Sequence, residues 1–306
     1  MALFMLVMLP SMTGYMAWEA RAVEVTVLEI DGAPEGVVFI TDPHIQDSNI
    51  DHVRKVIGEV NRLNPSLVLI GGDFVTGHES DFSSQTVWRS LNAPAYAVLG
   101  NHDYGVGIDG PTGVERLLAT RAYAAVTADG YDVSGLNDGS ADVAFADALE
   151  KALEENGVNV LRNEHVRVSV GGKEMVIVGL DDGWAGMTNP PDVPATDAFT
   201  LYLIHEPSCR ADWDADLILA GHTHGGQFLP PIVKQLNDFG IVELAGLFAR
   251  DGKTPAYISR GMCSASFAGV DLRFNCRPEI VLINPTEEQL RTLNGSANTV
   301  RVTRTA

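Results

Sequence analysis

Two histidines separated by one residue stand in a glycine-rich segment of this 306-residue chain. His222 and His224 belong to Gly221-His-Thr-His-Gly-Gly-Gln227, directly after the apolar run Leu217-Ile-Leu-Ala220. That run is typical of a short buried strand, so both imidazoles would stand where the chain leaves a sheet. Imidazole is the commonest metal ligand in proteins, and glycines let the backbone and a ligand approach closely. The segment indicates a metal site, and the alternative is a polar turn with two solvated histidines.

Four further segments repeat this design, with an acidic, amide or imidazole side chain at the end of a predicted buried strand. These side chains are Asp42 and His44 after strand 37–40, Asp73 after 67–70, Asn101, His102 and Asp103 after 96–99, and His205 after 200–204. Ligands of open α/β sheets collect at the carboxyl ends of the strands, so we expect one common rim. Carboxylate, imidazole and amide oxygen together suit a divalent cation such as Mn²⁺, Fe²⁺ or Zn²⁺. Without His102 and Asp103 the ligands are too many for one tetrahedral ion and suit two ions that share a carboxylate.

Such a pair of ions points to chemistry at phosphorus. Two cations about 3.5–4 Å apart lower the pKa of a bridging water and clamp the attacking and leaving oxygens of an in-line displacement. They also neutralise an anionic substrate within a chain of formal net charge −19. We therefore expect a metal-bridging hydroxide as the nucleophile, without a phosphorylated enzyme. His102 beside Asp103 suits a general acid, because a carboxylate can fix the imidazole tautomer and raise its basicity.

The motifs and their order resemble the calcineurin-like metallophosphoesterase superfamily over about residues 37–284. This resemblance implies an α/β fold, a four-layer αββα sandwich of two mixed β-sheets flanked by helices, with a dinuclear metal centre at the rim. One ion would be held by Asp42, His44, Asp73 and His224. The other would be held by Asp73, Asn101, His205 and His222, with Asp73 bridging. His102 would lie over the scissile phosphate and assist the leaving oxygen, oriented by Asp103.

A finer resemblance is to a membrane-associated branch of bacterial phosphodiesterases. It rests on segments 221–227, Ser259-Arg-Gly261 and Arg273-Phe-Asn-Cys-Arg-Pro-Glu279. Members of that branch often carry an N-terminal membrane segment, and some relatives cleave the pyrophosphate of a UDP-linked acylated glucosamine. Because guanidinium groups suit phosphate, Arg260 and Arg273 are candidate substrate contacts. The amide of Asn101 is a further candidate. For Arg277-Pro-Glu279 a structural turn before the last strand is an equal alternative.

The first 18 residues carry no charge, and Glu19 is the first charged residue. We interpret residues 1–22 as a candidate membrane anchor, although the run is shorter than the roughly 20 residues that a spanning helix needs. It also contains Pro10 and lacks the basic start of a secretory signal. We expect membrane association on an undetermined face. The alternative is a hydrophobic segment packed on a cytoplasmic domain.

The remaining residues, 23–306, are expected to form a single metallophosphoesterase domain, with an insertion at about 104–140. The insertion contains a predicted helix over 112–125 and is either a lid that selects substrate or a disordered excursion. Further helices are predicted after a Ser48 cap, over 83–91 and over 141–156. Further strands are predicted over 23–30, 158–161, 166–170, 175–180, 256–259 and 280–284.

Composition narrows the function. The chain has 21 basic and 40 acidic residues, which excludes a binder of nucleic-acid duplexes. Its three cysteines lack metal or disulfide spacing and are interpreted as ordinary thiols. We expect a dinuclear-metal-dependent phosphodiesterase or pyrophosphatase that acts on a membrane-proximal, lipid- or nucleotide-linked phosphate ester or pyrophosphate. The alternatives are a soluble phosphomonoesterase or protein phosphatase, and a metal-bound interaction scaffold without catalysis.

Overall fold

The computed structural model describes residues 2–77, 79, 81–120, 127–249, 253–264, 270–294 and 300–304. Its strands form two mixed sheets. The seven-stranded sheet has the order β13 (Val300–Arg304), β1 (Glu24–Glu29), β12 (Glu279–Ile283), β2 (Val37–Ile40), β3 (Leu67–Ile70), β4 (Ala95–Ala97) and β5 (Val158–Val160). The six-stranded sheet has the order β10 (Gly246–Phe248), β11 (Ala256–Ile258), β9 (Leu217–Ala220), β8 (Phe199–Leu203), β7 (Lys173–Gly179) and β6 (Glu164–Val170).

The strands that precede the predicted ligands run in one direction within each sheet. β2 pairs in parallel with β3, and β3 with β4, whereas β12 is antiparallel to β2. In the second sheet β8 and β9 are parallel, and the outer pairs β6–β7 and β10–β11 are antiparallel. Parallel strands end at the same edge of a sheet, so the residues that follow β2, β3 and β4 emerge together, as do those that follow β8 and β9.

Alternation along each strand builds two apolar layers. In β2, Val37 and Phe39 face the second sheet and share a buried cluster with Leu201 and Leu219. Val38 and Ile40 face the other way and pack in the cluster that contains the buried residues of helix α2 (Ile50–Arg62). Period-two alternation in strands that are buried on both faces explains why these segments are apolar throughout.

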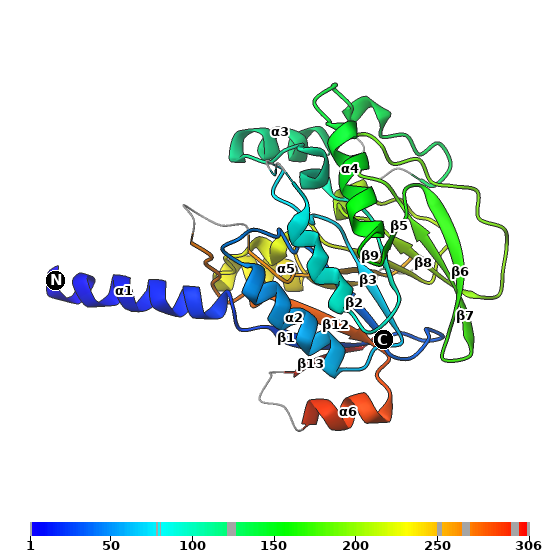
Figure 1. Ribbon diagram of the computed structural model, residues 1–306. Helices are drawn as coiled ribbons and strands as arrows, with labels where there is room; N and C mark the ends of the chain where they lie inside the picture. Colours follow the sequence, from blue (N-terminus) through cyan, green and yellow to red (C-terminus); the bar gives the residue numbers. More distant parts are fainter. Residues whose placement is uncertain are drawn as a thin grey trace.

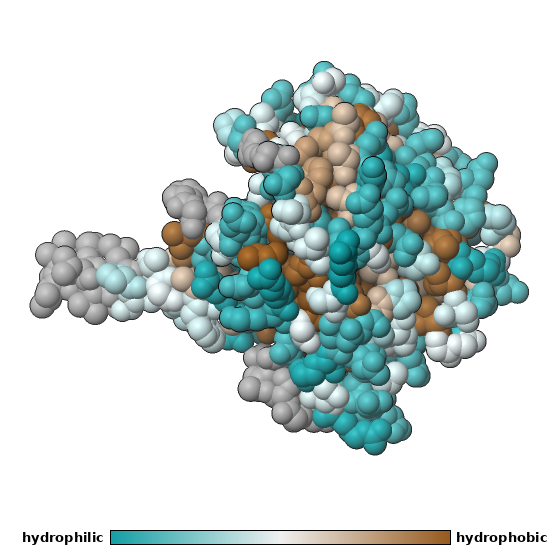
Figure 2. Space-filling view, in the orientation of Figure 1, coloured by the Kyte–Doolittle hydropathy of each residue, from teal (hydrophilic) through white to brown (hydrophobic). Residues whose placement is uncertain are grey.

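Helices cover one sheet and connecting segments help to cover the other. α2 and α4 (Val143–Glu154) lie over the seven-stranded sheet (Figure 1) and share its outer apolar cluster. Outside the six-stranded sheet the ring of Tyr202 stacks on Trp213, with ring centroids 4.9 Å apart. The predicted fold class, an α/β fold with two mixed sheets packed face to face, is confirmed. Hydrophilic residues cover most of the face seen in Figure 2, as the acidic composition requires.

Several element boundaries differ from the sequence-based expectation. The residue that precedes α2 is Asn49 rather than Ser48. Its side-chain amide accepts from Gln46 N (2.8 Å) and donates to His44 O (2.8 Å), so it holds the loop before the helix. The predicted helix 83–91 is the 3₁₀ helix η1 (Ser83–Ser90). The insertion contains helix α3 (Gly110–Thr120), and the predicted remainder from residue 121 to 125 lies outside the described residues.

Among the described residues, two α-helices and two strands lie where neither was predicted. They are β10, β13, α5 (Pro231–Asp238) and α6 (Glu287–Asn294). α5 has no buried residue and β10 is a three-residue edge strand, so neither carries the long apolar period on which the sequence-based assignment relied.

The N-terminal residues form helix α1 (Ala2–Glu19), which extends away from the two sheets (Figure 1). Within the described ranges, we find no helix with the length and apolar character that crossing a membrane requires. The last residue of α1 belongs to the domain, since the Glu19 carboxylate is buried and accepts from Asn275 N (2.9 Å) and Cys276 N (3.1 Å).

Candidate metal centre

The ends of β2, β3, β8 and β9 meet at one rim where the two sheets touch. Hydrogen bonds cross between them: His205 Nδ1 lies 2.6 Å from Gly71 O, and His222 N donates to Asp42 Oδ1 at 3.1 Å. Asp42 N in turn donates to Gly72 O at 3.1 Å. The strand ends are therefore locked to one another before any ligand is considered.

The backbone turns sharply at the predicted ligands. Five of them have left-handed φ angles: Asp42 (55°), His44 (38°), Asp73 (57°), His222 (68°) and His224 (50°). Left-handed backbone is unfavourable for residues other than glycine and costs about 1–3 kcal/mol each. Strain of this kind concentrates at functional sites, because it aims side chains where regular structure would not.

Glycines beside the ligands allow the strand ends to approach. A Cβ added to Gly100 would stand 2.4 Å from Asp73 Oδ1, and one added to Gly221 would stand 2.9 Å from Asp42 Oδ2. Both contacts are shorter than real carbon–oxygen contacts allow. At these two positions glycine is required because any side chain would meet another ligand, whereas neither glycine has a positive φ.

The first group of converging side chains is Asp42, His44, Asp73 and His224, all buried. Their ligand atoms lie within 4.8 Å of one another. His44 Nε2 is 3.1 Å from His224 Nε2 and 3.5 Å from Asp73 Oδ2, and His224 Nε2 is 3.7 Å from Asp42 Oδ1. The structure thus brings together the four residues expected to share one ion.

The second group is Asp73, His205 and His222, again within 4.8 Å. His205 Nε2 is 3.1 Å from Asp73 Oδ2, the same oxygen that faces His44. Asn101 completes this side: its Nδ2 donates to Val106 O (2.6 Å), and its Oδ1 lies 2.9 Å from His222 Nδ1. The amide is therefore oriented with its oxygen toward the other members, as a metal ligand requires.

Three of the imidazoles are oriented from behind by main-chain carbonyls. His44 Nδ1 faces Val75 O (3.1 Å), His224 Nδ1 faces Cys263 O (3.1 Å) and His205 Nδ1 faces Gly71 O (2.6 Å). A carbonyl only accepts, so each Nδ1 carries a proton, and each ring in its neutral form presents the Nε2 lone pair to the common space. Two lone pairs 3.1 Å apart, on His44 and His224, repel unless a cation lies between them.

Another buried ligand atom also lacks a protein partner. Asp42 Oδ2 accepts no hydrogen bond from any described residue. Buried polar groups in native proteins are almost always satisfied, and an ion is one accepted explanation for exceptions. The donor set of carboxylate, imidazole and amide oxygen fits two divalent cations that share Asp73.

Electrostatics favour the protonation states that metal binding needs at His44, His222 and Asp73, and oppose them at Asp42 and His205. Burial lowers the pKa of His44 to about 4, and burial with nearby His205 lowers the pKa of His222 to about 4. Burial raises the pKa of Asp42 to about 7. Burial also acts to raise the pKa of Asp73, yet His205 and His102 hold it well below its usual range. At neutral pH His44 and His222 are therefore neutral and Asp73 is ionised. Burial acts to lower the pKa of His205, yet the Asp73 carboxylate raises it well above its usual range, so this imidazole must lose a proton before it can bind a cation.

His102 lies at the edge of this cluster and is partly exposed. Its ring meets that of His44 edge to face with centroids 4.6 Å apart, and its Nδ1 lies 2.9 Å from Thr76 O. The expectation that Asp103 orients His102 is wrong. The Asp103 carboxylate accepts from Phe74 N (2.8 Å), Val75 N (3.2 Å) and Gly100 N (2.9 Å), and so ties the loops of Asp73 and Asn101 together.

The two arginines proposed as substrate contacts also need correction, because both are buried. Arg260 pairs with Glu24 (3.0 Å) and Glu279 (2.9 Å). Arg273 donates to main-chain carbonyls, including His224 O at 3.2 Å and Cys263 O at 2.5 Å. Both guanidinium groups are occupied inside the protein and offer no free fork to a phosphate.

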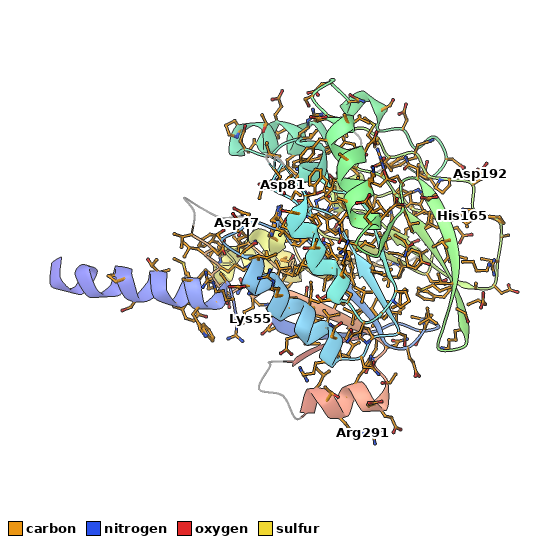
Figure 3. The ribbon with its side chains drawn as sticks, in the orientation of Figure 1. Asp47, Lys55, Asp81, His165, Asp192 and Arg291 are labelled. Atoms are coloured by element: carbon orange, nitrogen blue, oxygen red, sulfur yellow. The ribbon has the colours of Figure 1, made fainter. Side chains whose placement is uncertain are left out.

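Two buried carboxyl groups near the second ligand group were not identified from the sequence. Glu206 directly follows His205, and its Oε2 accepts from Gly183 N at 3.0 Å. Asp182 is buried beside it, and burial together with the Glu206 charge raises the pKa of Asp182 well above its usual range. An acidic residue directly after a strand-end histidine was the available signal. By contrast, His165 is exposed on the edge strand β6 (Figure 3) and belongs to neither group of converging side chains.

Metal affinity is expected to depend on pH through Asp42. Its pKa of about 7 means that below pH 7 a proton must leave before the carboxylate can bind a cation. One released proton weakens binding by about tenfold per pH unit below that value and has no effect well above it. Calorimetric titration of the metal-stripped protein with Mn²⁺ at about pH 6, 7 and 8 measures this linkage. Asp42→Asn should bind more weakly and lose the part of this pH dependence that Asp42 contributes, and an affinity that is equal at all three pH values would contradict the assignment.

Comparison with known proteins agrees with this geometry. Residues 36–226 match the family model described as calcineurin-like phosphoesterase. Phosphodiesterase YaeI of Escherichia coli is 29% identical over 265 residues, which cover 83% of each chain. The uncharacterized metallophosphoesterase YkuE of Bacillus subtilis is 28% identical and covers 80% of this chain and 77% of its own. UDP-2,3-diacylglucosamine pyrophosphatase LpxG of Chlamydia muridarum is 28% identical over 282 residues, with 81% and 82% covered.

The family match spans the strand ends that carry Asp42, Asp73, Asn101, His205 and His222, the groups that converge at the rim. With its buried cluster of metal-binding histidines and aspartates, this chain belongs to the calcineurin-like phosphoesterase family of metal-dependent hydrolases.

Proposed function

We propose that this protein is a dinuclear-metal-dependent phosphodiesterase or pyrophosphatase. The observation that carries the proposal is the position of one carboxylate oxygen. Asp73 Oδ2 lies 3.5 Å from His44 Nε2 and 3.1 Å from His205 Nε2, so one group serves both clusters. A shared carboxylate is what two cations separated by about 3.5–4 Å require.

The residues divide the work. Asp42, His44 and His224 would hold one ion, Asn101, His205 and His222 the other, and Asp73 both. When bound, the two cations would activate water as the nucleophile and neutralise the phosphate charge. His102, at the edge of the cluster, is placed to donate a proton to the leaving oxygen as the P–O bond breaks. Thr76 O holds its Nδ1, which leaves Nε2 for that transfer.

Two considerations support a diester or pyrophosphate over a monoester. A phosphate monoester carries one more negative charge than a diester at neutral pH. The arginines nearest the cluster are engaged internally with Glu24 and Glu279 or with carbonyls, so they do not offset that additional charge. The similarity to a phosphodiesterase and to a pyrophosphatase of a UDP-linked acylated sugar adds to this. We therefore propose a lipid- or nucleotide-linked substrate, and place the chain in the phosphodiesterase-like branch of its family.

We further propose that the protein works at a membrane surface, on a face that the charge pattern leaves open. The support is α1, an 18-residue helix whose only charged residue is its last. Its described outer side chains include Met12 (47% exposed), Tyr15 (44%) and Trp18 (54%). Tyrosine and tryptophan favour the membrane–water interface, where an apolar ring and a polar tip are both accommodated.

Asp73→Asn is expected to abolish hydrolysis and to reduce bound metal from two ions to one or none, because it weakens both sites. Metal analysis and turnover of bis-p-nitrophenyl phosphate, compared with p-nitrophenyl phosphate, measure this. The matched control is Asp192→Asn, which alters an exposed aspartate away from the cluster (Figure 3) and should keep both properties. Faster turnover of the monoester by the unaltered protein would favour a phosphomonoesterase instead.

His102→Asn is expected to lower kcat by about 10²–10⁴ for a diester with an alkyl leaving group, the usual contribution of a general acid. The loss should be much smaller for bis-p-nitrophenyl phosphate, because nitrophenolate leaves without a proton. Kinetics with the two substrates make the comparison. An equal loss with both would assign His102 to the binding of the substrate.

Membrane association is tested by flotation of the full chain with phosphatidylcholine vesicles. Replacing Tyr15 and Trp18 together by serine should weaken binding roughly tenfold or more, since each ring buries substantial apolar area. Leu290→Ser, a similar change on exposed α6, is the control and should bind as the unaltered chain does. Binding that is absent, or equal in all three proteins, would contradict the membrane proposal.

A further inference from the structure

Arg273 is one of the largest fully buried side chains of the molecule, with 0% of its surface exposed. In the part of the chain that the structure describes, no carboxylate forms an ion pair with it. Burying a cation without an opposite charge is unfavourable, and burial lowers the pKa of Arg273. A residue kept under this penalty must make contacts that a neutral side chain could not make.

Those contacts are with neutral acceptors from three separate segments. Nη2 donates to Cys263 O (2.5 Å), Nη1 donates to His224 O (3.2 Å) and Cys276 O (3.3 Å), and Nε donates to Ser264 Oγ (3.0 Å). The guanidinium is planar and its N–H directions are fixed. It therefore holds the three segments at set distances, which the three rotating donors on a flexible lysine stem could not do.

Two of these contacts converge on His224. Cys263 O, the acceptor for Arg273 Nη2, also receives the Nδ1 proton of His224 at 3.1 Å. Arg273 Nη1 holds the main-chain carbonyl of His224 itself. Arg273 thus fixes both the backbone of His224, which has a left-handed φ of 50°, and the carbonyl that orients its ring.

The carbonyl that orients His224 belongs to a different segment from those that orient His205 and His44. His205 and His44 are oriented by Gly71 O and Val75 O, carbonyls on the chain that leaves β3 between the two sheets. Cys263 lies beyond the end of β11, and its N–H donates to Asp42 O (3.2 Å). Its carbonyl is held by the guanidinium of Arg273 (2.5 Å).

We propose that Arg273 is a positioning residue that holds His224 in the geometry needed to bind a divalent cation with Asp42, His44 and Asp73. The inference rests on the ligand set of the proposed function. It assigns Arg273 no contact with the substrate. Loss of this second layer of contacts should weaken that ion site selectively, by about 10- to 100-fold, the usual effect of removing a group that orients a metal ligand.

The test is Arg273→Lys, which keeps the charge and removes the fork. Metal-stripped protein is titrated with Mn²⁺ by calorimetry, and bound metal is counted after dialysis. The expected result is one site of unchanged affinity and one weakened by about 10- to 100-fold. Arg116→Lys is the control, because Arg116 is also buried and donates to a main-chain carbonyl, Leu136 O, but lies in the insertion. Arg273→Lys with two unchanged sites, or with both sites weakened equally, would overturn the proposal.

A double-mutant cycle separates positioning from general destabilisation. If Arg273 acts through His224, Arg273→Lys should cause no further loss of Mn²⁺ affinity in a His224→Ala background. An additive loss would overturn the proposal. If His224→Ala alone leaves both affinities unchanged, the proposed ligand set fails together with the inference. A weakened His224→Ala with an unchanged Arg273→Lys would remove the inference alone.

Circular dichroism and thermal unfolding establish that each variant is folded. Should Arg273→Lys fail to fold, Ser264→Ala decides the question, since it removes one acceptor from the same guanidinium with little change in volume. A selective loss of affinity at one site, smaller than about tenfold, is then expected. Two unchanged sites in Ser264→Ala would overturn the proposal.

Discussion

The architecture of this protein depends on one buried carboxylate that both sheets must reach. Asp73 follows β3, yet its Oδ2 faces His205 of the second sheet as well as His44 of the first. Its Oδ1 accepts from His102 N at 2.9 Å, which leaves the group no rotational freedom. The two sheets can pack only in the arrangement that lets their carboxyl ends surround this group.

That arrangement conflicts with the ordinary rules of protein interiors. It gathers carboxylates, imidazoles and left-handed backbone in a water-poor volume, where unpaired charge and strained conformation both reduce stability. The conflict is relieved if cations enter, because each unfavourable feature then becomes a ligand or a means of aiming one. The large apolar layers on both faces of β2 stabilise the fold and offset the strained backbone at the rim. The same cations account for phosphate chemistry in a chain that is strongly acidic.

Much of this was accessible from the sequence because strand ends carry two clear signals. An apolar run fixes the strand, and the polar residue after it marks the rim, so Asp42, Asp73, His205 and His222 could be grouped without coordinates. Side-chain direction was not accessible. Adjacency suggested that Asp103 serves His102, but within the 3₁₀ turn 101–104 neighbouring side chains diverge and Asp103 meets backbone N–H groups instead. Because basic residues are scarce, Arg260 and Arg273 were expected to bind phosphate. Both are buried instead, and no periodicity in the sequence indicates that these two side chains are buried. The roles of the insertion and of the N-terminal residues stay predictions.

Three hydrogen-bonded links join the N-terminal helix to a metal ligand. Glu19 holds the N–H groups of Asn275 and Cys276, Cys276 O receives Arg273, and Arg273 holds His224. Arg273 N also donates to Met16 O, inside α1. A force that tilts or pulls α1 would therefore reach the catalytic rim through a short polar chain. The helix is therefore mechanically coupled to His224, one of the residues that would hold an ion, and a shortened chain that begins after Glu19 would lose that coupling and leave the N–H groups of Asn275 and Cys276 without this acceptor.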